Sequence, residues 1–144
     1  MHRIATEIEI GAPVERVWAV LTDFSGYPRW NPFIRSVAGT LQEGATLTVH
    51  IQPHGAKAMR FRPRVLGVQP CRELRWKGRL LVPGLFDGEH QFRLQPTGAG
   101  SSVLHHVETF SGVLVPLLRR TLDGATRQGF IAMNRALKQE AERQ

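Results

Sequence analysis

Cysteine is almost absent from this sequence of 144 residues, which contains Cys71 and no other. A single cysteine excludes an internal disulfide and is compatible with a reducing compartment. No run approaches the roughly 20 apolar residues of a membrane-spanning helix, so we expect no stable membrane insertion. The N-terminal residues, MHRIATEIEI, lack the apolar centre of a signal peptide, so we expect a cytoplasmic protein.

The best-marked catalytic and cofactor-binding motifs are also missing. The sequence has no GxSxG nucleophile elbow, no GxxxxGK[ST] phosphate loop and no dinucleotide fingerprint on a strand–helix–strand unit. Cysteine and histidine do not occur at the spacings that converge on zinc. We therefore predict neither a metal site nor a cofactor, and the absence of these motifs leaves open whether the chain is an enzyme.

Acidic residues are fewer than basic ones, since 12 Asp and Glu stand against 19 Lys and Arg and give a net charge of +7. This balance attracts phosphate groups, either in nucleic acid or in acidic lipid. The basic residues are dispersed, however, and the outward-facing aromatic side chains that would stack on bases are missing. We therefore do not expect nucleic acid as a partner.

What the sequence does contain is a succession of alternating patterns. Residues 4–10 place isoleucine and threonine opposite alanine and glutamate, which is typical of a half-buried strand. Pro13 precedes an amphipathic helical pattern over 14–22. Alternation of the same kind over many segments predicts an antiparallel sheet with one buried face. The further predicted strands are 34–41, 46–51, 59–65, 73–80, 86–95 and 103–110.

Two of these segments carry basic side chains on the outward face. Their outward positions are Arg60, Arg62, Arg64, Arg75, Lys77 and Arg79. The favoured interpretation is a solvated sheet surface, and binding of an acidic partner is the alternative. The inward positions of the segment 73–80 are Leu74, Trp76, Gly78 and Leu80.

The chain ends in a long amphipathic pattern. Pro116 fits the first turn of a helix, and apolar residues recur on one side as far as Leu137. A helix over 115–141 would be about 40 Å long, which matches the width of a curved sheet. We expect it to lie across the concave face. Gly124 and Gly129 interrupt it, which allows a bend, a close approach or space beneath the helix.

The segment 27–33, YPRWNPF, fits neither pattern. It combines three aromatic residues with two prolines and is too broken for a regular helix or strand. Tyr27, Trp30 and Phe33 offer apolar surface either to the opening of a cavity or to the end of the core. The sequence leaves both interpretations open.

Four segments together carry a family resemblance. They are APVERVWAVLTDFSGYPRWNPF (12–33), FDGEHQFRL (86–94), ETFSGVLVPLL (108–118) and GFIAMNRALK (129–138). The chain resembles the START-like superfamily, also labelled SRPBCC, and within it the polyketide cyclase/dehydrase-type branch of small bacterial proteins. The resemblance implies one α+β domain over residues 1–144 with a helix-grip fold. In this fold a curved antiparallel sheet wraps the C-terminal helix around an apolar cavity, with short helices after the first strand.

The inward positions and the resemblance together predict the residues that bind a ligand. A filled core is the alternative, because bulky inward rings shrink any cavity. The predicted ligand-binding residues are Tyr27, Trp30, Phe33, Ile51, Met59, Phe61, Trp76, His90, Phe92, His106, Glu108, Phe130 and Met133.

Polar residues at inward positions are the candidates for chemistry. His90 shares its face with Phe92. For the strand 103–110 we favour the register that buries His106 and Glu108, because it also buries the larger apolar side chains. The three polar residues would then meet if the two strands pair as a hairpin. Such a cluster could satisfy its own hydrogen bonds, orient a ligand, or act as general acid and base.

Three hypotheses for function remain. The first is binding or transport of a small hydrophobic molecule, either a lipid, a sterol-like compound or an aromatic, polyketide-like compound. The second is an enzyme of the aromatase/cyclase or dehydratase kind that uses His90, His106 and Glu108. The third is an interaction module that docks through the basic sheet face. We favour the first because few polar groups face inward; the sequence specifies neither the ligand nor the oligomeric state.

Overall fold

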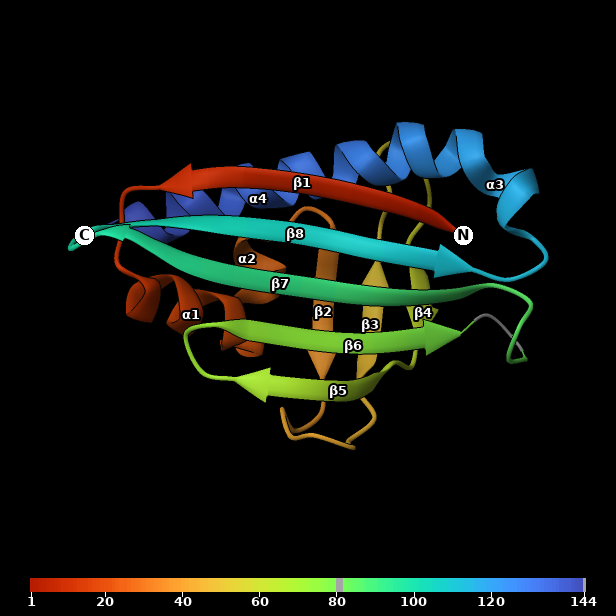
Figure 1. Cartoon of the computed structure of the whole chain (residues 1–144), viewed down its shortest axis with the longest axis horizontal. Helices are drawn as coiled ribbons and strands as arrows, with labels where there is room; N and C mark the ends of the chain where they lie inside the picture. The colour runs from red at the N-terminus through yellow and green to blue at the C-terminus, as the bar shows by residue number, and fades with distance from the viewer. Residues whose placement is uncertain (80–81, 144) are drawn as a thin grey trace.

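A five-stranded antiparallel sheet forms one wall of the protein in the computed structural model, which describes residues 1–79 and 82–143 (Figure 1). The predicted strands 4–10, 73–80, 86–95 and 103–110 are confirmed in this sheet with small shifts at their ends. Leu80, predicted to face inward, lies outside the described residues. The strands in spatial order are β1 (His2–Ile10), β8 (Ser101–Ser111), β7 (Asp87–Gly98), β6 (Glu73–Arg79) and β5 (Arg64–Gln69).

A second sheet of three strands crosses behind the first (Figure 1). It contains β2 (Ile34–Ala38), β3 (Thr48–Ile51) and β4 (Met59–Phe61). The prediction of one strand over 59–65 is wrong, because the chain leaves this sheet after β4 and enters the larger one at β5. Pro63 lies at the crossing, where its lack of an N–H costs no ladder hydrogen bond. An isolated bridge between Thr46 and Arg64 joins the two sheets, which together form the curved antiparallel wall.

This crossing divides the basic row that the sequence predicts on one outer face. Arg60 belongs to the small sheet and Arg64 to the large one. Arg75 lies between two carboxylates, with its Nε 2.8 Å from Glu73 and its Nη1 3.5 Å from Glu89. Within the described residues, the row is therefore interrupted by a change of sheet and partly compensated by acidic neighbours.

Helical turns connect the first strand to the second sheet: α1 (Val14–Thr22), the 3-10 turn η1 (Phe24–Gly26) and α2 (Tyr27–Trp30). The prolines predict an irregular segment at 27–33, but its first four residues form a helical turn. Pro28 is tolerated there because it lies in the first turn. Asn31 follows, and its Oδ1 accepts the N–H groups of Phe33 at 2.9 Å and Ile34 at 2.8 Å.

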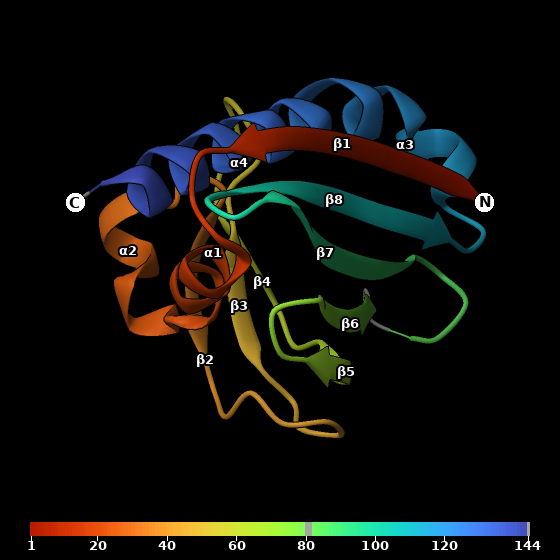
Figure 2. The ribbon, with the colours of Figure 1, turned by 60° about the vertical axis from the view of Figure 1, so that its left-hand side comes forward.

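The C-terminal helix runs along the two sheets, with α1 and α2 near its C-terminal end (Figure 2). It consists of α3 (Val115–Thr121), a wide π-type turn η2 (Leu122–Thr126) and α4 (Arg127–Glu142), which confirms the helix predicted over 115–141. Gly124 lies in the wide turn, where the carbonyl of Ala125 accepts the N–H of His54 at 3.3 Å. Among the described residues, no helix combines the length and apolar character that crossing a membrane requires.

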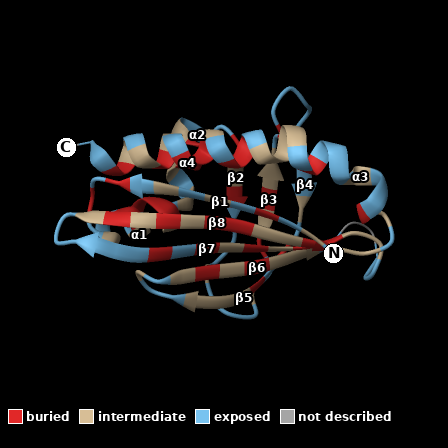
Figure 3. Cartoon of the chain, turned by 45° about the horizontal axis from the view of Figure 1, so that its top comes forward, coloured by how far each residue is buried: buried red, intermediate tan, exposed pale blue. Residues whose placement is uncertain are grey.

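Buried residues lie along the strands of both sheets and on one side of α4 (Figure 3). Leu74, Phe92, Leu94 and Leu104 fill the space next to the β7–β8 hairpin, and each is at most 4% exposed. The architecture is thus an α+β helix-grip fold, in which two antiparallel sheets hold the long C-terminal helix.

Candidate functional site

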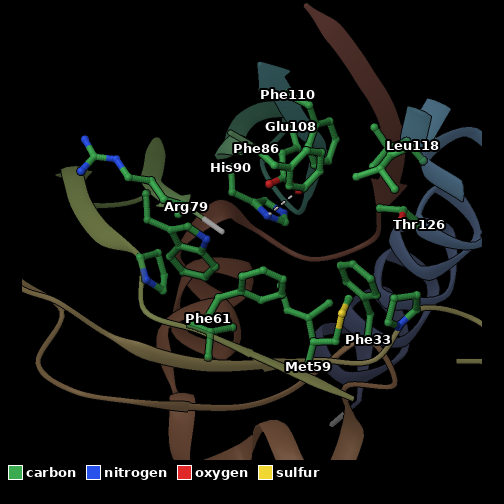
Figure 4. A pocket seen from close by; sticks show the side chains of 18 of the residues that line it. Phe33, Met59, Phe61, Arg79, Phe86, His90, Glu108, Phe110, Leu118 and Thr126 are labelled. Carbon is green, nitrogen blue, oxygen red and sulfur yellow. Dashed lines mark ion pairs between the residues drawn. The ribbon is translucent and has the colours of Figure 1, made fainter. Parts of the chain in front are cut away.

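A cavity of about 330 Å³ lies between the two sheets and the C-terminal helix (Figure 4). Seven of the predicted ligand-binding residues line it, namely Phe33, Ile51, Met59, Phe61, Trp76, His90 and Glu108. The remaining lining comes from residues outside the predicted set. These are Val49, Pro53, Pro63, Gly78, Arg79, Phe86, Gly88, Phe110, Leu118, Thr121, Leu122 and Thr126.

Two glycines form a pair on the wall of this cavity. Gly78 on β6 and Gly88 on β7 lie directly opposite each other, and both line the cavity. The next pair of β6 and β7 residues that faces inward is Trp76 opposite His90. The wall has no side chain of its own at the glycine pair: Glu108 Oε2 fills the space beside Gly88, whereas the space beside Gly78 is open. The sequence places Gly78 on the inward face, but its pairing with a second glycine depends on the hairpin register, which the alternation alone does not give.

Six predicted ligand-binding residues do not line the cavity: Tyr27, Trp30, Phe92, His106, Phe130 and Met133. Phe92, Phe130 and Met133 are fully buried in the core between sheet and helix and do not belong to the cavity lining.

Tyr27 and Trp30 support the end of the core, which was one of the two interpretations of the aromatic segment. Tyr27 is fully buried, and its hydroxyl donates a hydrogen bond to the carbonyl of Leu21. Its ring meets Trp30 edge-on, with centroids 5.1 Å apart. Burial raises the pKa of Tyr27 further above its ordinary range, and the negative charge of Asp23 adds to this effect. Of the three aromatic residues, only Phe33 reaches the cavity.

His90 and Glu108 bring polar atoms to the cavity wall. They lie directly opposite each other on β7 and β8, which is the register that we favoured for the strand 103–110. His90 Nδ1 is 3.3 Å from Glu108 Oε1, as the dashed line in Figure 4 marks. The pair is close but poorly aligned, so among the described residues the buried Nδ1 has no well-directed hydrogen bond.

A chain of hydrogen bonds continues behind His90. His90 Nε2 is 2.6 Å from His106 Nε2, and His106 Nδ1 is 2.8 Å from Asn134 Oδ1. Asn134 Nδ2 donates to Thr6 Oγ1 at 2.9 Å, and the hydroxyl of Thr6 donates to the carbonyl of His106 at 2.9 Å. We call these five residues, Glu108, His90, His106, Asn134 and Thr6, the polar chain.

Asn134 and Thr6 were not among the predicted site residues, although each gives a signal in the sequence. Thr6 interrupts the inward isoleucines of the first strand, and Asn134 lies beside the apolar stripe of the last helix. A polar residue on an apolar face requires a partner. Within residues 1–79 and 82–143, no three His, Cys, Asp or Glu side chains form a group that could hold a metal ion.

Burial sets the charge of the polar chain. His106 stacks on Phe130 with centroids 4.1 Å apart, and His90 stacks on Phe92 at 4.7 Å. Desolvation lowers the pKa of His90 well below its usual value, and the neighbouring His106 lowers it further. Desolvation also lowers the pKa of His106 to about 3, although its hydrogen bond with Asn134 acts in the opposite direction. Burial raises the pKa of Glu108 to about 8. All three groups are therefore mainly uncharged at neutral pH.

Residues 1–142 match the sequence family described as polyketide cyclase / dehydrase and lipid transport. The chain belongs to this family. Among solved structures, the Zhui aromatase/cyclase from Streptomyces sp. R1128 is 19% identical with a TM-score of 0.80, and the match covers 99% of this chain and 94% of that one. A START superfamily protein from Mycobacterium smegmatis is 20% identical with a TM-score of 0.73, covering 96% of this chain and 99% of that one. No curated protein matches the chain.

In this member of the polyketide cyclase / dehydrase and lipid transport family, we expect Glu108 to titrate near pH 8. The measurement is a carboxyl-carbon NMR titration, with the Glu108 signal assigned by its loss in Glu108→Gln. The stability of the folded protein should change over the same pH range. Because the folded-state pKa lies above the ordinary value of 4.5, the protein loses stability as pH rises from 4.5 towards 8. Glu108→Gln carries no charge and should escape this loss.

The histidines also change stability with pH, in the opposite direction, but their contribution is the same in the parent protein and in Glu108→Gln and cancels in the comparison. His90 and His106 have lowered pKa values, so both proteins lose stability as pH falls below about 6.5. Arg79 from β6 is the other charged residue on the cavity wall, and it is also common to both. A Glu108 midpoint near 4.5, together with parallel stability curves, would contradict the prediction.

Proposed function

We propose that the chain binds a small, largely apolar molecule in the cavity between the two sheets and the C-terminal helix. The observation that carries this proposal is the cavity itself, of about 330 Å³, whose wall is mainly aromatic and aliphatic. Ligand pockets commonly measure about 300–1,000 Å³, so this one suits a compound of about one or two rings. The family description, which includes both cyclases and lipid transport, supports a small-molecule role.

Polar contacts in the cavity are few and localised. His90 and Glu108 meet at one point of the wall, while Thr121 and Thr126 contribute from the helix side. Arg79 also belongs to the wall, but its guanidinium points away from the cavity (Figure 4). An apolar cavity with a few convergent polar groups is the usual form of a small-molecule site, in which the apolar surface supplies affinity and the polar groups supply orientation.

Gly78→Leu should weaken ligand binding strongly while leaving the fold intact. A Cβ added at this position meets only Pro63, at 3.7 Å, so the new side chain can enter the cavity without a clash at its base. We expect binding of an apolar ring probe such as 2-naphthol, measured by calorimetry, to weaken at least about tenfold, which corresponds to about 1.4 kcal/mol.

Lys77→Leu is the matched control, since it places the same side chain on the outward face of the same strand. It should bind the probe as the parent does. Equal binding by the parent and by a correctly folded Gly78→Leu variant would show that the probe does not use this cavity. Native mass spectrometry of the freshly purified protein, followed by extraction, would identify any molecule that copurifies in it.

Acid–base catalysis of the aromatase/cyclase or dehydratase kind is a second candidate function. The observation that favours it is the contact between Glu108 and His90 on the wall of the cavity. A neutral carboxyl group beside a neutral imidazole can give a proton to one atom of a substrate and accept one from another. The test is dehydration of a phenyl-substituted β-hydroxy ketone to its enone and water. Turnover by the parent and not by Glu108→Gln would support an enzyme, and its absence in both would favour binding alone.

A further inference from the structure

Each hydrogen bond of the polar chain has a defined donor and acceptor. They can be assigned one after another, starting from Thr6 at the end far from the cavity. The hydroxyl of Thr6 donates to the carbonyl of His106, so its oxygen is left to accept the amide N–H of Asn134. The acceptor atom of that amide, Oδ1, then faces His106 Nδ1 at 2.8 Å. An amide oxygen only accepts hydrogen bonds, so His106 Nδ1 carries a hydrogen. In a neutral imidazole the other nitrogen, Nε2, is then an acceptor.

The position of the hydrogen on His106 also determines the position of the hydrogen on His90, which lines the cavity. Because His106 Nε2 accepts, His90 Nε2, which is 2.6 Å away, must carry a hydrogen. The neutral ring of His90 therefore has a lone pair at Nδ1, which is 3.3 Å from Glu108 Oε1. An ionised carboxylate would place a second acceptor against this lone pair. A carboxylic acid instead supplies the donor that the buried Nδ1 needs, so the polar chain favours a protonated Glu108.

The second carboxyl oxygen of Glu108 lies beside Gly88, a residue of the cavity wall. A Cβ added at Gly88 would lie 2.3 Å from Glu108 Oε2, so this oxygen occupies the space of the missing side chain on the cavity wall. The Glu108 side chain is 14% exposed, whereas that of His90 is 1% exposed. Glu108 is therefore the member of the pair that a bound molecule can reach. With the carboxyl proton on Oε1, the oxygen nearer to His90 Nδ1, Oε2 is a neutral hydrogen-bond acceptor.

We propose that the cavity selects a neutral ring compound bearing a hydroxyl group, such as a phenol or an enol, whose hydrogen is accepted by Glu108 Oε2. This inference rests on the proposed binding function and specifies the ligand class for it. A carboxylate in the same position would bring a negative charge and further acceptors against Oε2. An ether would offer no hydrogen. Burial, which raises the pKa of the Glu108 carboxyl group, acts in the same direction as the hydrogen-bond chain.

Three probes of similar size and shape test the proposal: 2-naphthol, 2-methoxynaphthalene and 2-naphthoate. Calorimetry at about pH 6 keeps the naphthol neutral and the naphthoate ionised. We expect 2-naphthol to bind about five- to tenfold more tightly than the ether, as one net hydrogen bond predicts, and 2-naphthoate to bind most weakly.

Substitutions of Glu108 assign the selectivity to this side chain. Glu108→Gln reproduces the neutral carboxyl group, because its amide donates to His90 Nδ1 and its carbonyl oxygen still accepts. We expect this variant to rescue the preference for 2-naphthol over the ether. Glu108→Leu removes the acceptor, and the two probes should then bind about equally. Should Glu108→Leu fail to fold, the Gln variant and the probe series on the parent protein still decide the question.

The outcomes separate the two proposals. If all three probes bind the parent with equal affinity, the binding function stands and the selectivity is overturned. Tighter binding of 2-naphthoate, or loss of the hydroxyl preference in a folded Glu108→Gln protein, also overturns it. If none of the three probes binds, the proposed binding function fails for ring compounds of this size, and the inferred ligand class fails with it.

Discussion

Gly129→Ala should destabilise the protein by about 2 kcal/mol, although alanine is the better helix former. A Cβ at this position would lie 2.3 Å from Cδ1 and 2.6 Å from Cε1 of the Phe33 ring. Phe33 is 1% exposed and packs against Phe130 with centroids 5.4 Å apart, so its ring can yield only towards the cavity that it lines, at the cost of this packing. Overpacking of this kind costs about 1–3 kcal/mol or more, and the gain in helix propensity offsets about 1 kcal/mol of it.

Gly124→Ala is the matched control, because it makes the same change in the same helical run. No atom lies within 4 Å of a Cβ added there. This variant should be neutral, or more stable by up to about 1 kcal/mol. Chemical denaturation of both variants measures the difference. Phe33→Leu should recover part of the loss in the Gly129→Ala protein, since the smaller side chain relieves the contact. Equal effects of the two alanines, with no rescue, would mean that the close approach does not determine stability.

The contact between Phe33 and Gly129 also connects the fold to the cavity. Phe33 is the single member of the aromatic segment that lines the cavity, and the helix meets its ring where it has no side chain. A shift of this ring would change the shape of the wall as well as the packing of the core. We therefore expect substitutions at Gly129 to affect ligand binding and stability together, whereas Gly124→Ala should affect neither strongly.

Alternation predicted the elements of this fold because each strand has one buried face. Over 103–110 it left two facings open, and the size of Leu104 and Phe110 favoured the one observed, in which both are buried. It failed at Pro63, because the side chains of 59–65 continue to alternate while the backbone changes sheet. The order of inward and outward residues does not record which neighbour a strand pairs with.

The candidate site was predicted less completely, and the reasons are geometric. The pairing of Gly78 with Gly88 on the cavity wall could not be predicted, because it requires the register of two strands. Tyr27 was predicted at the cavity but lies in the core, since a carbonyl at the end of α1 accepts its hydroxyl. His106 faces inward as predicted, yet lies one layer behind the wall. Inward facing alone does not distinguish the lining of a cavity from the core behind it.

Asn134→Leu should destabilise the protein by about 2–4 kcal/mol, because it removes the amide that organises the polar chain. The substitution leaves the Nδ1 hydrogen of His106 buried without an acceptor, and Thr6 loses its donor. A buried unsatisfied polar group costs about 1–3 kcal/mol, and the neighbouring bonds weaken with it. Arg135→Leu is the control, since it places the same side chain at the next, exposed position of the helix and should change stability by less than about 0.5 kcal/mol.

A double-mutant cycle separates the hydrogen bond from packing. His106→Phe keeps a ring stacked on Phe130 but needs no partner at position 134. The double variant should therefore be about 1–2 kcal/mol more stable than the sum of the two single losses predicts.

The titration of Glu108 provides a second readout, which a purely structural role would leave unchanged. Without Asn134, His106 is free to place its hydrogen on Nε2, and His90 can then donate from Nδ1 to an ionised carboxylate. The pKa of Glu108 should therefore fall in a folded Asn134→Leu protein. Additive losses and an unchanged Glu108 midpoint would show that the amide does not set the direction of the chain.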